Sequence, residues 1–338
     1  MTAKTELTED QKSWVVDVSH VLGSASPHSH STDGGTLRVG ELKVSFLDAD
    51  AARNRRQRAR ALIVPREHGA WGLLLVPMVT GAGIAFREAG NVAPFLLLMV
   101  GALALFWLRT PLESLLGTSA MRAQTKDERR SVASAIGCFG GVALLTLGAL
   151  LRSGRNPLLW LIGATAGAAF AGQALLKLMS RQPLSKTSAH RLRMLSEIVG
   201  TIGLTAAAPA AYYVITGKFG VTAWVVWAAN LIFAGDQIHY VQLRLHTARI
   251  EGFLAKLKRG WAFAAGQALM TAALTLACLF RIIPPITSIA FSPILFRGWF
   301  YFIQNPTSPL VVRKLGWNEL AHAVVFSVLL IATFAVAR

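Results

Sequence analysis

The chain has 338 residues, of which 53% are hydrophobic and only 15% are charged. Soluble domains carry about 25% charged residues, so this composition excludes an ordinary soluble protein and is typical of one embedded in a membrane. The formal net charge is +17. Its cations are spread over several loops rather than gathered in one patch, which argues against a nucleic-acid partner and indicates anionic membrane lipids instead.

The N-terminal part of the chain differs in composition from the rest. Residues 1–52 hold eight of the 17 acidic side chains, and Arg53–Arg60 form a basic run just before the first apolar stretch. Polar segments of this kind cannot bury enough apolar surface to fold. We therefore interpret residues 1–62 as a disordered, basic cytoplasmic extension and residues 63–338 as a transmembrane helical domain.

Nine apolar stretches follow, each close to the roughly 20 residues that a helix needs to cross a bilayer. They predict an all-α fold, a polytopic transmembrane bundle of about nine helices. Pro209 is expected to bend the fifth stretch, and Pro284, Pro285, Pro293 and Arg297 predict that the eighth is kinked, broken or re-entrant. The stretches are 69–86, 92–109, 132–151, 157–178, 195–216, 220–240, 261–280, 283–303 and 318–337.

Small residues recur at a spacing of four in two of these stretches. Gly137 with Gly141, and Gly163 with Gly167, form small-xxx-small pairs. Such pairs let helix backbones approach closely in lipid, so they predict tight helix packing at these positions.

Lysine and arginine fall mainly in every second gap between the apolar stretches. The second, fourth and sixth gaps carry five cations each, whereas the first, third, fifth and seventh carry one or two. Positively charged loops stay in the cytoplasm. The pattern predicts a multi-pass protein of the cytoplasmic (inner) membrane with its N-terminus inside and its C-terminus outside.

The first candidate site is the run that opens the first apolar stretch. It contains Arg66, Glu67, His68 and Trp71, directly after Pro65. Proline and an acidic residue suit the first turn of any helix, which is a purely structural explanation. His68 and Trp71 share a helix face and need another explanation. We predict a catalytic role for His68, with the other three binding substrate.

Two further candidates are single charged residues near the ends of apolar stretches. Arg109 follows the second stretch and is spaced to pair with Glu113 on one helix face, and Glu197 lies just inside the fifth. We predict that Arg109 and Glu197 bind substrate. The alternative is structural: an ion pair at the membrane surface for Arg109, and pairing with an arginine for Glu197.

The end of the sixth stretch carries a polar stripe. Asp236, His239, Tyr240 and Arg244 recur at three- and four-residue spacing on an otherwise apolar helix. We predict that Asp236 and His239 are catalytic and that Tyr240 and Arg244 bind substrate; the alternative is a polar clamp between helices. Asn318, Glu319 and His322, at the start of the last stretch, are a weaker candidate that we expect to lie opposite them.

All of these groups fall on the predicted cytoplasmic side, where arginines outnumber carboxylates. A pocket lined in this way suits an anion, such as a phosphate or diphosphate headgroup whose apolar tail lies between helices. The sequence shows no cluster with metal-ligand spacing, so no metal site is predicted.

The run from Arg66 to Trp71 resembles the YwiC-like family of bacterial membrane proteins. Weaker matches are Arg109-Thr110-Pro111, Glu197-Ile198-Val199-Gly200 and Val241-Gln242-Leu243-Arg244. The resemblance covers about residues 64–338 and implies a membrane protein without implying an activity.

A more distant likeness is to the UbiA-type prenyltransferases, which have nine helices and hold a magnesium diphosphate with Asp-rich loops after helices two and six. Here the second gap has no Asp cluster, and the sixth keeps only Asp236 and Glu251. Holding Mg²⁺ against a diphosphate takes two or more carboxylates, so the cofactor is left unassigned. We expect a UbiA-like bundle that binds or transfers an isoprenoid or another anionic lipid. A small-molecule transporter and a non-enzymatic scaffold are the alternatives, and whether the protein is an enzyme stays open.

Overall fold

The computed structural model describes residues 53, 57–65, 68–88, 91–119, 121–154, 156–180, 186–248, 250–304 and 310–336. The chain divides into two units, Met1–Arg53 and Asn54–Arg338, and the following description concerns the second. The disorder expected for residues 1–52 lies outside the described residues. Residues 57–63, assigned from sequence to the extension, are helical, and Leu62 among them is buried.

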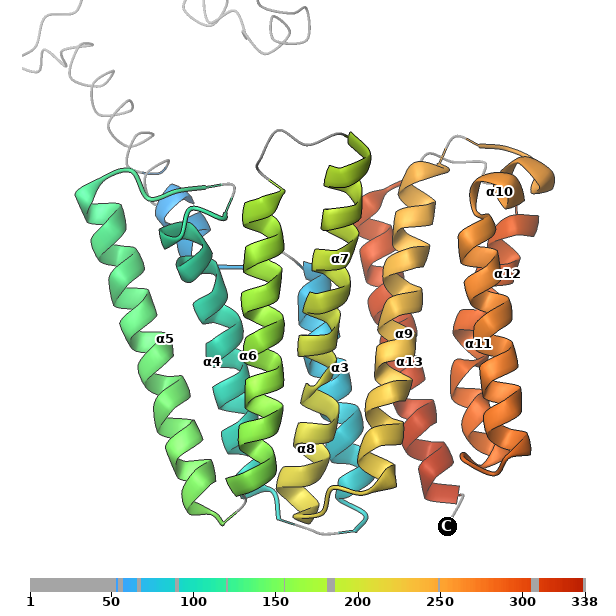
Figure 1. The fold of residues 1–338 in the computed structure, drawn as a ribbon, viewed down its shortest axis with the longest axis horizontal. Coiled ribbons are helices and arrows are strands. Elements are labelled where there is room, and N and C mark those ends of the chain that lie inside the picture. The colour runs from blue at the N-terminus through green and yellow to red at the C-terminus, as the bar shows by residue number, and fades with distance from the viewer. Residues whose placement is uncertain are drawn as a thin grey trace, which may run out of the picture. The chain divides into compact units, whose positions relative to one another are not determined.

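The described part of the second unit consists of helices and connecting loops without any strand, so the predicted all-α fold is confirmed (Figure 1). Within the described ranges eight spans are long and apolar enough to cross a membrane, and Trp71–Ala85 is a shorter apolar stretch. A multi-pass helical membrane protein follows. The helices are α3 (His68–Ala85), α4 (Ala93–Leu115), α5 (Lys126–Arg152), α6 (Asn156–Met179), α7 (Lys186–Thr205), α8 (Ala207–Thr216), α9 (Val221–His246), α10 (Phe253–Arg259), α11 (Trp261–Leu279), η2 (Pro285–Phe291), α12 (Ser292–Ile303) and α13 (Val312–Val336).

Both predicted proline breaks are present. The fifth stretch is divided into α7 and α8 at Ala206, because Pro209 has no N–H to donate to the carbonyl of Thr205. The Thr205 hydroxyl adds a local bond to the Thr201 carbonyl at 2.8 Å. The eighth stretch begins as the 3-10 helix η2 at Pro285 and continues as α12.

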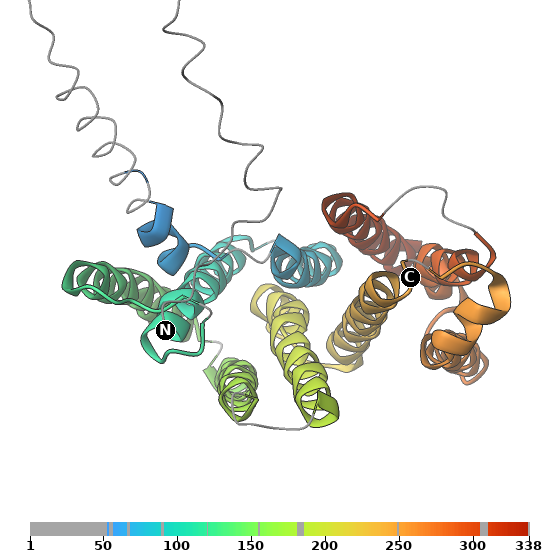
Figure 2. The same ribbon diagram turned by 90° about the horizontal axis from the view of Figure 1, so that it is seen from above.

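The apolar core lies where α3, α8, α9 and α13 meet. Phe233 of α9 and Phe326 of α13 stack with ring centroids 4.4 Å apart, and both are almost fully buried. Helices α3 and α8 approach very closely, since a Cβ on Gly81 would lie 2.0 Å from the carbonyl oxygen of Ala208. Figures 1 and 2 show α4, α5 and α6 toward one end of the bundle and α11 and α12 toward the other.

The predicted packing at the four-residue glycine pairs is wrong for contacts within this chain. A Cβ placed on Gly137, Gly141, Gly163 or Gly167 would meet no atom of the described residues within 4 Å. These glycines lie on α5 and α6, at the end of the bundle where few helices surround them (Figure 2).

Candidate functional site

The structure distributes the predicted site residues over two separate polar groups. One is a cavity between α4, α6 and the helical residues 57–63, which we call the α4–α6 cavity. The other is a buried ionic group that joins α9, α11, α12 and α13, which we call the Arg297 cluster. Figures 1 and 2 place these two sets of helices toward opposite ends of the bundle.

The α4–α6 cavity has a volume of about 250 Å³. It lies at the C-terminal ends of α4 and α6, next to the cation-rich second and fourth gaps. One side of it is formed by residues 57–63, which are held on α4 by a bond from the Ser114 hydroxyl to the Leu62 carbonyl at 3.3 Å. The lining residues are Ala61, Val64, Pro65, Phe106, Arg109, Thr110, Glu113, Thr118, Ser119, Met121 and Lys177.

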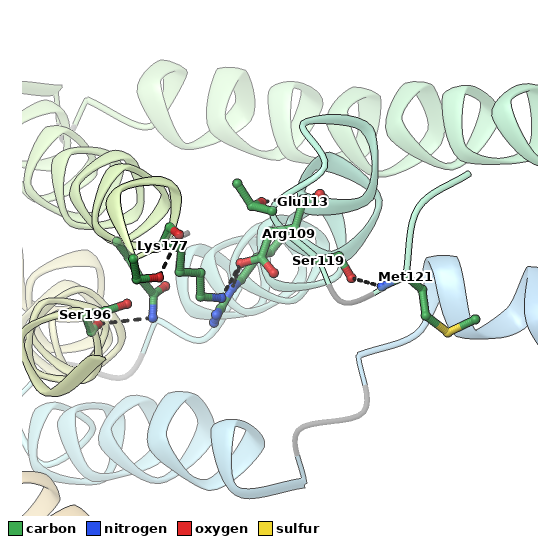
Figure 3. A network of polar contacts seen from close by, with 9 residues as sticks. Arg109, Glu113, Ser119, Met121, Lys177 and Ser196 are labelled. Carbon is green, nitrogen blue, oxygen red and sulfur yellow. Dashed lines mark hydrogen bonds and ion pairs between the residues drawn. The ribbon is translucent and has the colours of Figure 1, made fainter. Parts of the chain in front are cut away.

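Charged side chains from two helices meet at this cavity. The Glu113 carboxylate accepts a bond from Arg109 Nε at 2.9 Å, which confirms the predicted pair, and one from Lys177 Nζ at 2.9 Å. Figure 3 shows Arg109 and Lys177 reaching the carboxylate from α4 and α6. Among the described lining residues two cations therefore face one carboxylate. Lys177 is the most accessible of the three, with 28% of its side chain exposed.

The aromatic side of the cavity connects it to the run that opens α3. Phe106 lines the cavity, and the Trp71 ring packs edge-on against it with centroids 4.9 Å apart. Pro65, which precedes the run, also lines the cavity. Arg66 and Glu67 lie outside the described residues, and of His68 only its backbone position at the start of α3 is described. Pro65, directly before the run, thus lies at the cavity, and Trp71, the last residue of the run, is connected to it through Phe106.

The Arg297 cluster is centred on an arginine of α12 that the sequence did not indicate as a site residue. Arg297 Nη2 donates to Asp236 Oδ2 of α9 at 2.6 Å, and Nη1 donates to Glu319 Oε2 of α13. The side chains of all three are at most 6% exposed. The Gln267 amide of α11 donates to the second oxygen of Asp236. Four helices are joined by this network.

Of the predicted polar stripe on α9, two members belong to the Arg297 cluster. Besides Asp236, the Tyr240 ring contacts the guanidinium, with Arg297 Cζ 4.1 Å from the ring centroid. The other two point elsewhere: His239 packs against the Phe263 ring at 6.0 Å, and Arg244 lies 5.3 Å from the Tyr301 ring. The stripe is therefore not one continuous surface.

Glu197 belongs to neither group. Its carboxylate accepts weak bonds from the Gln242 amide at 3.4 and 3.5 Å, joining α7 to α9. Among the residues whose side chains the structure describes, the expected arginine partner is not found. The geometry supports a helix contact for Glu197.

Arg297 and Lys177 were not predicted as site residues, and only Arg297 has a feature in the sequence that indicates a buried partner. An arginine inside an apolar stretch is costly in lipid and therefore needs a buried partner; Arg297 was interpreted only as a reason for the stretch to break. Lys177 had been counted as a loop cation, and no local spacing relates it to Glu113.

The arrangement does not favour a bound metal. No group of three or more His, Cys, Asp or Glu side chains that could hold an ion occurs in the described ranges. At the cavity the carboxylate of Glu113 is engaged by two cations. Mg²⁺ at a diphosphate instead needs carboxylate oxygens of its own, so these residues do not fit it.

Residues 64–212 match the family described as YwiC-like protein, which confirms the resemblance over that range. No curated protein and no solved structure matches the chain. The likeness to UbiA-type prenyltransferases stays a prediction. The matched range contains every lining residue of the α4–α6 cavity except Ala61, and it ends before Asp236, the first residue of the Arg297 cluster.

Proposed function

With residues 64–212 belonging to the YwiC-like family, we propose that this integral membrane protein binds an anionic amphiphile, such as an isoprenoid phosphate or diphosphate, at the α4–α6 cavity. The observation that carries the proposal is the pair of cations, Arg109 and Lys177, which converge there on a single carboxylate. An anion at the cavity can accept hydrogen bonds from both cations.

The two cations supply different kinds of recognition. The planar guanidinium of Arg109 matches two phosphate oxygens at once, whereas the Lys177 ammonium acts as a compact point charge on a flexible stem. Glu113 holds both in place through its two 2.9 Å bonds while no anion is bound. The anion therefore meets cations whose positions are already set, which lowers the ordering cost of binding.

The size of the cavity indicates how an amphiphile divides between protein and lipid. Drug-sized ligands occupy roughly 300–1,000 Å³, so a cavity of about 250 Å³ accommodates a headgroup and few carbons. Val100 and Trp107, seven residues apart on one face of α4, are 44% and 37% exposed. We propose that the tail lies along this apolar surface, within the bilayer.

Binding rather than catalysis is what the geometry supports. Of the three predicted catalytic residues, Asp236 is held by Arg297 and Gln267, and His239 packs on Phe263. Only His68, three residues beyond Pro65, starts its helix next to the cavity. The predicted inner-membrane location, with the cavity facing the cytoplasm, is part of the proposal and is supported by the cations in alternate gaps.

The proposal is tested with the full-length protein in nanodiscs, titrated with farnesyl diphosphate by calorimetry. Hydrogen bonds to charged groups contribute about 1.5–3 kcal/mol, so we expect Lys177→Gln to weaken binding by at least about tenfold. Lys218→Gln is the matched control, because Lys218 is an exposed lysine in the loop before α9. Equal affinity of wild type and the folded Lys177→Gln variant, or no binding to wild type, contradicts the proposal.

A further inference from the structure

We propose that the Arg297 cluster is a binding site for a single proton, shared between Asp236 and Glu319 and taken up from the cytoplasmic water. This site is separate from the anion site and stands without it. Three observations carry the inference: the charge of the cluster, its burial, and two polar atoms in it that lack partners.

The charge of the cluster is unbalanced. Asp236 and Glu319 each contribute one negative charge, and Arg297 is the single cation in contact with them among the residues whose side chains the structure describes. The fully ionised cluster therefore has a formal charge of −1. An unbalanced charge costs several kcal/mol when it is taken out of water, so the ionised form is expected to bind one cation.

The cluster lies well inside the helices. Glu319 is seven residues from Val312, the start of α13, which corresponds to about 10 Å along the helix axis. The three ionic side chains are 5–6% exposed. A proton fits this setting better than a hydrated metal ion, since the described residues hold no group of three or more ligands for one.

The unpaired polar atoms point to the form that the bound cation takes. Gln267 is 1% exposed; its amide nitrogen donates to Asp236, whereas its oxygen has no hydrogen-bond partner. A protonated Asp236 can donate to that oxygen once the amide has turned by half a rotation. Gln267 thus serves both forms of Asp236, as a donor to the ionised carboxylate and as an acceptor from the protonated one.

The second unpaired atom is on the arginine itself. Arg297 Nε is buried without an acceptor while both terminal nitrogens bind carboxylates. The next residue, Gly298, contacts the Gln267 amide. A Cβ on Gly298 would lie 2.7 Å from the carbon and the oxygen of that amide, so a side chain at this position would clash with it. Helix α12 therefore leaves space for the amide beside the arginine.

The titratable and charged groups around the cluster do not replace the two carboxylates as the site of the proposed proton. On α9 the Tyr240 ring covers the guanidinium, and Arg244 lies over Tyr301 of α12 at 5.3 Å. On α13, His322 is the nearest other titratable group; its Nδ1 contacts the Asn318 carbonyl at 2.7 Å. From α11 only the neutral Gln267 contacts Asp236.

The test is infrared spectroscopy of the full-length protein in nanodiscs, titrated from acidic to alkaline pH. We expect the carbonyl stretch of a protonated carboxyl group at neutral pH. This band should be lost in Asp236→Asn and equally in Glu319→Gln, because either substitution leaves one carboxylate balanced by Arg297. It should persist in His322→Gln and in Glu251→Gln, a control on an exposed carboxylate.

Isotopic labelling of aspartate or glutamate carboxyl carbons identifies the band in the wild type, so the test does not depend on the folding of the variants. A wild-type protein without the band, or a band that survives both cluster substitutions, overturns the proposal. The proposal is also overturned if the protein lacks the band and is more stable in sodium chloride than in choline chloride. In that case the bound cation is sodium.

Discussion

The substitution Glu113→Gln is predicted to strengthen anion binding while it weakens the fold. It removes the negative charge of Glu113, which Arg109 and Lys177 both contact, and keeps the shape of the side chain. An anionic ligand then no longer competes with a fixed carboxylate for the two cations. A purely structural ion pair predicts a loss of stability without any gain in affinity.

The magnitude follows from the geometry of the cavity. Both cations lie 2.9 Å from the carboxylate, so an anion that touches both sits about 6 Å from Glu113. Two like charges at that distance repel by about 3 kcal/mol at an effective dielectric constant of about 20. Lys177 is 28% exposed, and solvent screening lowers this value further. We therefore expect a gain of about tenfold in affinity, or about 1.4 kcal/mol.

Stability should change in the opposite direction. Glu113→Gln removes two charge-assisted bonds, which are the contacts that Arg109 and Lys177 share. A loss of about 1–3 kcal/mol in the free energy of unfolding is expected, and added ligand should recover part of it.

The assay combines farnesyl diphosphate titration with thermal unfolding of the same nanodisc samples, with and without ligand. Glu251→Gln is the control, since Glu251 is an exposed carboxylate on the same predicted side of the membrane. If the folded Glu113→Gln variant binds the diphosphate no better than wild type, the competition between carboxylate and ligand is refuted. Weaker binding shows that Glu113 favours the anion more by holding the two cations in place than it opposes it by charge repulsion.

Three other outcomes are expected. Gly81→Ala should lower the free energy of unfolding by about 1–3 kcal/mol, because its Cβ meets the Ala208 carbonyl. Gly137→Ala, in open space, should change it by no more than about 0.5 kcal/mol in thermal unfolding. Equal effects of the two substitutions contradict the α3–α8 contact. Arg109→Lys should weaken diphosphate binding more than monophosphate binding by calorimetry, since lysine has no planar fork. Compartment-sensitive reporters on the two termini should report opposite sides of the membrane, and a shared side refutes the nine crossings.

The fold was predictable because its strongest determinants are local. Stretch length and proline position are read residue by residue. The fifth stretch divides three residues before Pro209, and η2 gives way to α12 next to Pro293. Glycine packing was not predictable in this way. Gly137 and Gly141 have the favoured spacing but face no neighbour, while Gly81 meets the α8 backbone. Spacing shows that two glycines share a face, but it does not show what that face meets.

In the candidate site, contacts within one helix were predictable and contacts between helices were not. Arg109 and Glu113 are four residues apart on one helix, so their bond follows from helix geometry. The bond from Lys177 joins residues 64 positions apart, and those of Arg297 depend on how α9, α12 and α13 pack. No single-sequence rule gives such partners. Sequence indicates only that a cation buried in an apolar stretch must have one.

The two groups differ in the sign of their charge, and this separates their roles. At the α4–α6 cavity two cations converge on the Glu113 carboxylate, and the proposed ligand is an anion. In the Arg297 cluster two carboxylates converge on one guanidinium, and the proposed ligand is a proton. The groups share no residue and lie on different helices, and substitutions at such distant sites are normally additive. Glu319→Gln should therefore leave the affinity for farnesyl diphosphate unchanged, and a change of more than about threefold would show that anion and proton binding are coupled through the bundle.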